Sequence, residues 1–147
     1  MVRMCRRWSL LALTLGVVSS SCSSTGPSKD LDGTYALVKF NDLPLPAQIV
    51  QLPDQNQQPT SCWLTVSEGE LTLTVATLSY RYTIVNRNSC TQAILSLGEV
   101  TGRFELSGDV VTLYVVGAGG ERAIPTTHIG DTIGIHPSND FYYYEKQ

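Results

Sequence analysis

The chain has 147 residues, of which 42% are hydrophobic and 16% charged, a balance typical of one small globular domain. It therefore resembles neither a disordered chain nor a membrane-embedded helical bundle. Thirteen acidic residues outnumber ten Lys and Arg, and no basic cluster offsets the negative charge. Because such a chain repels phosphate backbones, we expect no nucleic-acid partner.

The first predicted element is a secretory signal over residues 1–21. Three arginines within the first seven residues precede the apolar run at 10–18, and small residues follow up to Cys22. This order of basic, apolar and small residues is typical of an export signal. The run has only half of the roughly 20 apolar residues that span a bilayer, so a permanent transmembrane anchor is the weaker alternative. We expect an exported protein of the cell envelope.

The serine-rich stretch that ends in Cys22 resembles the bacterial lipoprotein signal. In that signal the cysteine is linked to diacylglycerol and becomes the first residue of the protein. The usual pattern has Leu three residues before the cysteine, whereas this chain has Ser19. Ordinary cleavage near Ser20 or Ser21 is the alternative. The resemblance implies that diacylglycerol on Cys22 attaches the chain to a membrane.

The cysteine count bears on the same question. If Cys5 leaves with the signal, three cysteines remain, and an odd number is unusual in an oxidising compartment. Lipidation of Cys22 would leave Cys62 and Cys90 to form a disulfide. Such a bridge would contribute about 3.5 kcal/mol in the chain-entropy model.

Residues 22–30 are short, polar and rich in Ser, Gly and Pro, and we expect a flexible tether there, followed by a folded domain over 31–147. From residue 33 the apolar residues alternate with polar ones, which predicts strands. These strands are expected at 33–40, 62–68, 70–75, 80–85, 101–107, 109–116, 121–129, 131–136 and 141–146. Turn residues separate them, including Glu68-Gly69, and a short helix is expected at 90–98.

About nine short strands joined by tight turns predict an all-β fold, a small antiparallel up-and-down barrel or a sandwich. The barrel is favoured because eight or so strands enclose room for side chains or one small ligand. The aromatic residues of the last strand also suit pairing with the first. In a simple meander Cys62 and Cys90 fall at opposite ends of the barrel, so residues 86–90 would have to fold back by about 15 Å.

A long connection between the first two strands holds four prolines and the apolar stretch from Leu43 to Leu52. Long loops of this kind are often functional lids. We expect either a lid or plug over one end of the barrel, or a plain surface loop.

The motifs at 31–47, 101–115 and 142–146 resemble the lipocalin-like (calycin) lipoproteins of bacterial genomes. They read "LDGTYALVKFNDLPLPA", "TGRFELSGDVVTLYV" and "YYYEK". Lipocalins proper carry Gly-x-Trp where this chain has Gly33-Thr34-Tyr35, and Asn41-Asp42 replaces an Asn-Gly turn, so no ligand preference is carried over.

The resemblance implies a lipocalin-like barrel with a pocket at one end, no cofactor and no catalytic machinery. Tyr35 would then lie at the closed end, either as a plain core residue or beneath Lys146 or Arg103 in a cation–π contact.

Motifs for catalysis or metal binding are missing from the sequence. His128 and His136 would lie about three residue steps, roughly 10 Å, apart, too far to share a metal ion. The glycine-rich run at 117–120 lacks the features of a phosphate loop, and Glu68 and Glu70 would be solvated beside a turn. We expect neither an enzyme nor a metal site.

Two functions fit this sequence. The first is a monomeric, lipid-anchored envelope protein whose barrel binds a small, partly apolar ligand. The residues predicted to contact that ligand are Phe40, Leu45, Leu73, Tyr82, Phe104 and Tyr114. The second is a filled barrel whose outer surface docks another envelope protein, as an assembly factor or inhibitor, through a tyrosine-rich patch at 142–144.

Overall fold

The computed structural model describes residues 31–108 and 110–147, which form an antiparallel sheet of the predicted all-β class. In chain order the strands are β1 (Gly33–Phe40), β2 (Leu43–Pro44), β3 (Ala47–Pro53), β4 (Pro59–Thr74), β5 (Ser79–Asn88), β6 (Ile94–Ser107), β7 (Val110–Gly117), β8 (Gly120–Ile124), β9 (Thr126–Ile129), β10 (Thr132–Ile135) and β11 (Tyr142–Lys146). A short 3₁₀ helix, η2 (Val75–Thr77), joins β4 to β5. The predicted signal, the tether and Cys22 lie outside the described residues.

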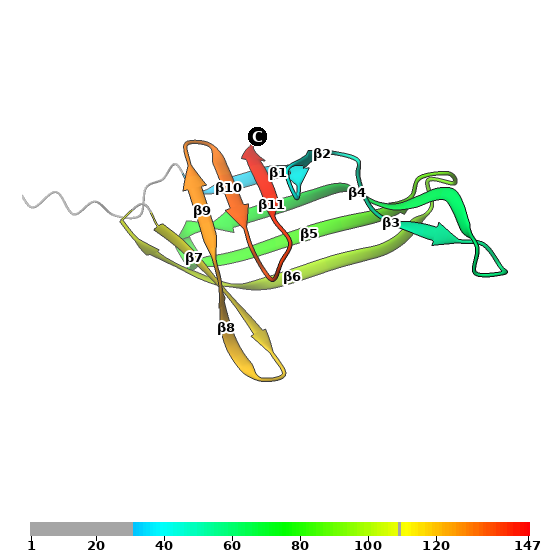
Figure 1. Cartoon of the computed structure of the whole chain (residues 1–147). Coiled ribbons are helices and arrows are strands. Elements are labelled where there is room, and N and C mark those ends of the chain that lie inside the picture. The colour runs from blue at the N-terminus through cyan, green and yellow to red at the C-terminus, as the bar shows by residue number, and fades with distance from the viewer. Residues whose placement is uncertain (1–30, 109) are drawn as a thin grey trace, which may run out of the picture.

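The strands follow the spatial order β8-β7-β6-β5-β4-β1-β11-β10-β9, so the sheet is a meander that nearly closes into a barrel (Figure 1). The first and last strands are neighbours, as predicted, and Leu37 pairs with Tyr144. In the described part of the chain no backbone ladder joins β7 to β9. The Thr126 hydroxyl instead donates a hydrogen bond to the Val111 carbonyl oxygen across this gap.

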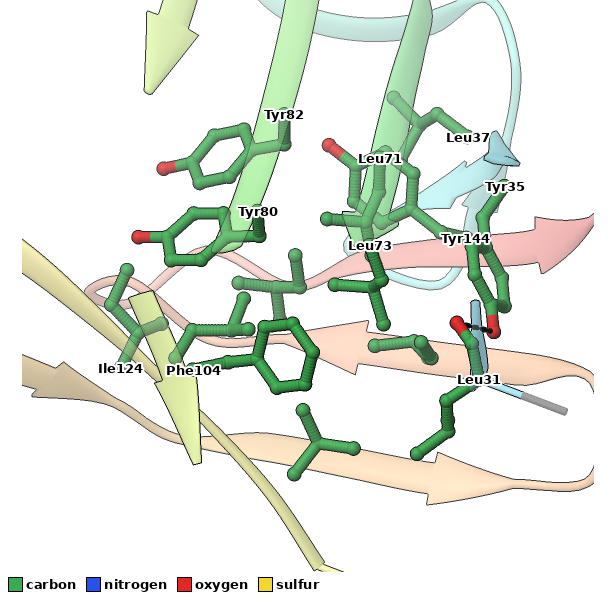
Figure 2. Close-up of a cluster of buried hydrophobic side chains, with 14 of the residues drawn as sticks. Leu31, Tyr35, Leu37, Leu71, Leu73, Tyr80, Tyr82, Phe104, Ile124 and Tyr144 are labelled. Atoms are coloured by element: carbon green, nitrogen blue, oxygen red, sulfur yellow. Dashed lines mark hydrogen bonds between the residues drawn. The ribbon is translucent and has the colours of Figure 1, made fainter. Parts of the chain in front are cut away.

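Alternation along each strand decides which side chains enter the barrel. On β4, Leu71 and Leu73 are buried whereas Thr72 is only half-buried and Thr74 is exposed. The same alternation holds on β5 at Tyr80 and Tyr82 and on β1 up to Leu37, after which a bulge brings Phe40 to the buried face. Figure 2 shows the resulting cluster, in which aromatic and aliphatic side chains from opposite walls pack against each other.

Three central strands, β4, β5 and β6, extend beyond one end of the barrel. The ladder between β1 and β4 ends at the pair Ala36 and Glu70, but β4, β5 and β6 continue. Beyond that point β3 pairs with the edge of β4 that β1 leaves. We call this extension the arm: β3 with residues 59–68 of β4, 84–88 of β5 and 94–99 of β6. Figure 1 shows the arm projecting away from β9, β10 and β11.

The turn predicted at Glu68-Gly69 is wrong, because β4 runs through it. Glu68 pairs with Val85 and Gly69 with Ile84, and only a bulge before Glu68 interrupts the ladder. A Cβ on Gly69 would lie 2.5 Å from the Thr83 carbonyl oxygen and 3.1 Å from the Leu37 side chain. The glycine therefore permits a close approach of neighbouring strands within the sheet.

The helix predicted at 90–98 is also wrong. Residues 94–98 begin β6, and the five residues before them make the turn that follows β5. Gln92 adopts a positive φ of 61° and its N–H donates to the Asn88 carbonyl oxygen at 2.8 Å. The stretch from Ile94 to Leu97 pairs with β5, with one bulge at Leu95, and this pairing outweighs the weak local preference of one or two helical turns.

The connection from Leu43 to Leu52 is neither a lid nor a plain loop. Most of it forms β3, which pairs with the first half of β4 through Ala47 and Val66. Ala47 is buried and Leu45 packs against the core, whereas Val50 is exposed on the arm.

Candidate functional site

The structure brings together five of the six side chains predicted to contact a ligand. Phe40, Leu73, Tyr82 and Phe104 are buried members of the core cluster, and Leu45 packs against it. Tyr114 lies on the outer face instead. Its hydroxyl donates to Glu105 Oε2 at 3.0 Å, and the Arg103 guanidinium lies 4.0 Å from the centre of its ring.

Tyr35 is both a core residue and the partner of a cation. It is 1% exposed, its hydroxyl donates to the Leu31 carbonyl oxygen at 3.0 Å, and Lys146 Nζ lies 6.0 Å from its ring centre. The predicted contact with Lys146 is therefore confirmed, and Arg103 instead faces Tyr114. Figure 2 shows the hydrogen bond to Leu31 as a dashed line.

Tyrosine hydroxyls make the barrel interior partly polar. The rings of Tyr80 and Tyr82 stack with centres 6.1 Å apart, and the Tyr142 ring lies 5.1 Å from that of Phe40. Tyr144 is fully buried, and its hydroxyl finds no hydrogen-bond partner among residues 31–108 and 110–147.

Burial also changes the acidity of these phenols. It raises the pKa of Tyr80 and of Tyr142 to about 12, and it raises that of Tyr144 further above its usual range. At neutral pH the interior therefore offers hydrogen-bond donors and no charge.

Two depressions on the surface are bounded by described residues, and both are open to solvent. One, of about 390 Å³, lies where β1 leaves β4 and is lined by Leu37, Leu45 and Gly69 beside the carboxylates of Glu68 and Glu70. The other, of about 560 Å³, lies over outward-facing threonines of β4 and β6. Neither has the dry apolar lining that a buried ligand pocket requires.

The arm exposes apolar side chains on its β6 strand. Ile94 and Leu97 are 57% and 63% exposed, and Leu95 between them is also exposed. The ladder between β6 and β7 ends at the pair Arg103 and Tyr114, so along 94–101 the described structure leaves the side of β6 away from β5 unpaired. We call residues 94–101 of β6 the open edge.

The open edge has few of the features that prevent edge-to-edge association, apart from a bulge at Leu95, where its register with β5 shifts. It holds no proline and one charged residue, Glu99, whose carboxylate is bound by Arg81 at 3.0 Å. The edge on the other side of the arm differs, because Pro46 and Pro53 flank or end β3 and cannot donate to an added strand.

The predicted disulfide between Cys62 and Cys90 forms, and it closes the tip of the arm with a Cα–Cα distance of 5.4 Å. The pair Leu64 and Asn88 sets the register, so the two cysteines lie opposite each other. The expected obstacle, cysteines at opposite ends of a barrel, disappears because 62–74 is one strand and not two. The Trp63 N–H also donates to Ser89 Oγ at 2.8 Å, so the tip holds the open edge in a fixed shape.

Sequence reasoning missed the open edge because it assigned those residues to a helix. A signal was present in the sequence. The segment "ILSLGEV", from 94 to 100, has four apolar residues and a single charge. This composition is typical of a strand that another segment or chain covers.

The side chains with acid–base or metal-binding chemistry lie apart. His128 pairs with Ile133, and the His136 N–H donates to the Pro125 carbonyl oxygen. Glu68 and Glu70 are exposed to solvent, as predicted, but they lie on β4 and not at a turn. Glu68 also binds Arg87 at 2.5 Å.

Across residues 31–108 and 110–147, no three residues of His, Cys, Asp or Glu are grouped so as to hold a metal ion. The same ranges contain no helix long and apolar enough to cross a membrane. No model of a known protein family, no curated protein and no solved structure matches this chain.

Proposed function

We propose that this chain is a non-catalytic envelope protein that binds another protein chain through its arm, with the barrel as the scaffold. The observation that carries the proposal is the open edge: an unpaired strand with exposed Ile94, Leu95 and Leu97, held rigid by a disulfide. Exposed apolar strands promote pairing with other chains, and soluble proteins usually protect them.

The packing of the barrel also favours a role on the outside. The largest buried side chains, Tyr35, Tyr144 and Phe104, are almost completely excluded from solvent within the core cluster. None of the exposed residues of the arm contributes to that cluster. The core of the barrel therefore does not need the exposed residues of the arm. We infer that these residues bind another protein chain.

Attachment to a membrane belongs to the same proposal. Lipidation at Cys22 would hold the barrel near a membrane surface, and a tether over 22–30 would let the arm reach a partner beside it. Mass spectrometry of the mature protein tests this point. Diacylglycerol on Cys22 supports the anchor, whereas an unmodified chain that starts near residue 21 contradicts it.

Site-specific photo-crosslinking in the native host tests the role of the arm. A photoreactive amino acid replaces Leu97, or in the control Val116, an exposed strand residue of β7 that is 75% exposed. We expect a distinct adduct from position 97 and none from position 116. The same pattern of adducts from both positions, or no adduct from either, would contradict the proposal.

The Tyr144 hydroxyl favours a second candidate, a small and partly apolar ligand inside the barrel. A buried phenol hydroxyl without a hydrogen-bond partner destabilises the folded state. A ligand with a hydrogen-bond acceptor would supply that partner. Native mass spectrometry of the protein from its own host tests this candidate. A co-purified molecule that is lost from the Tyr144→Phe variant supports it, and an unliganded mass argues against it.

A further inference from the structure

We propose that the arm binds a second copy of this chain, through antiparallel pairing of the two open edges about Leu97. This inference rests on the proposed function, because it names the partner of the same arm. It also replaces the monomer expected from the sequence.

The backbone of β6 is oriented to accept another strand. The Phe104 N–H donates to the Leu78 carbonyl oxygen at 2.8 Å, and the ladder from there to Ser96 has no register shift. In an antiparallel ladder, alternate residues direct both backbone groups to the same neighbour. Even-numbered residues therefore face β5, and Leu97 and Glu99 direct their N–H and C=O groups outward.

An antiparallel edge can pair with a copy of itself, because a two-fold rotation about its midpoint brings donors to acceptors. A midpoint at Leu97 places that side chain opposite the partner's Leu97. It also places Leu95 opposite the partner's Glu99. The Leu97 pair joins residues whose backbone groups face outward, and at Leu95 the register of β6 with β5 shifts by one residue.

Charges in this arrangement do not oppose it. Glu99 is the single charged residue of the open edge, and Arg81 of the same chain holds its carboxylate. The two Glu99 side chains of the pair lie on opposite sides of the midpoint and do not meet. A different partner would need a strand that is also apolar and weakly charged. A second copy of this chain already carries such a strand.

The side chains at the midpoint also gain cover. Leu97 pairs with Val85 on β5, and Val85 in turn pairs with Glu68 on β4, so these residues form one row on the outer face. Leu97 is the exposed end of that row, at 63%. Addition of the partner's Leu97 extends the row and removes both leucines from water, which is favourable.

Cysteine cross-linking of the purified full chain tests the inference. In the Leu97→Cys variant the two new thiols would face each other in a backbone-paired position, where Cα atoms lie about 5.5 Å apart, within disulfide range. We expect a covalent dimer after mild oxidation, with the link mapped by mass spectrometry to residue 97 of both chains. The matched control is Val116→Cys, and the unmodified chain gives the background from Cys5 and Cys22.

Sedimentation equilibrium gives an independent readout. The unmodified chain should show a reversible monomer–dimer equilibrium, and Leu97→Lys should weaken the dimer at least about tenfold. Val116→Lys should leave it unchanged. Circular dichroism of both lysine variants checks that the barrel is intact, since each substitution replaces an exposed residue.

Three outcomes separate this inference from the proposed function. A link at residue 97 together with weakening by Leu97→Lys supports the second copy. A monomeric chain that cross-links equally at 97 and 116 overturns it. If the chain is monomeric and the photo-crosslinker at residue 97 gives an adduct of another mass in the host, the second copy is overturned and the proposed function stands.

Discussion

The hydroxyl of Tyr144 provides the sharpest test of the barrel interior. Replacement of Tyr144 by Phe removes a buried phenol oxygen that makes no hydrogen bond within the described structure and keeps the ring. Burial of such a group without a partner costs about 1–3 kcal/mol in proteins. We therefore expect Tyr144→Phe to raise the free energy of unfolding by about 1–3 kcal/mol, in contrast to most core substitutions.

Tyr35 is the matched control, because it is buried to the same degree and differs in its hydrogen bond. Its hydroxyl donates to the Leu31 carbonyl oxygen at 3.0 Å, and the phenylalanine variant would leave that oxygen unsatisfied. The expected loss is about 1–3 kcal/mol. The same chemical change at two buried positions should thus shift stability in opposite directions.

Urea unfolding, monitored by circular dichroism, measures both variants under one condition. A change of 1 kcal/mol corresponds to a shift in Tm of about 4 °C for a domain of this size, so thermal unfolding provides a second measurement. If Tyr144→Phe destabilises the protein as much as Tyr35→Phe does, the Tyr144 hydroxyl has a partner in solution. That result would refute an unpartnered Tyr144 hydroxyl and would strengthen the candidate of an internal ligand.

Three further predictions follow from single features. Because burial raises the pKa of Tyr80 to about 12, from an ordinary value near 10, the neutral phenol favours the folded state. Its contribution is complete below about pH 10 and is lost as the pH rises toward 12. Urea unfolding between pH 8 and 12 should therefore show a free energy of unfolding that falls with pH, and this fall should be smaller in the Tyr80→Phe variant. Replacement of both Cys62 and Cys90 by Ser should cost about 3.5 kcal/mol, and a reductant should cause the same loss in the unmodified chain but none in the variant. A Cβ on Gly102 would lie 2.0 Å from a carbonyl oxygen of β7, whereas on Gly98 of the same strand the nearest atom would lie 3.8 Å away. Gly102→Ala should therefore destabilise the barrel by about 3 kcal/mol and Gly98→Ala by less than about 0.5 kcal/mol, and equal effects in denaturant titrations would contradict this account.

The strands of the barrel were predictable because their alternation records burial directly. Residues such as Leu71 and Leu73 recur every second position, and the structure buries them on one face. The hairpins at 117–120 and 130–131 were predictable too, since glycine at a positive φ is the residue those turns require.

The arm was not predictable from the same signals. A glycine marks either a turn or a close approach of backbones, and at Gly69 only the tertiary structure shows that the second applies. Dividing β4 at that residue separated Cys62 from Cys90 and concealed the extension. The open edge was lost for a related reason: nine residues are too few for periodicity to distinguish a strand from a short helix.

The pairing of the first strand with the last governs when the fold can form. Leu37 pairs with Tyr144, so the wall of the barrel has a gap between β1 and β10 until β11 is available. A chain that leaves the ribosome, or crosses a membrane, from its N-terminus therefore stays open until β11 has emerged. Contacts so distant in sequence slow folding, and removal of only the last six residues would leave β1 and β10 without their shared neighbour. The final residues of the chain thus decide the moment at which the barrel becomes a protected, folded unit.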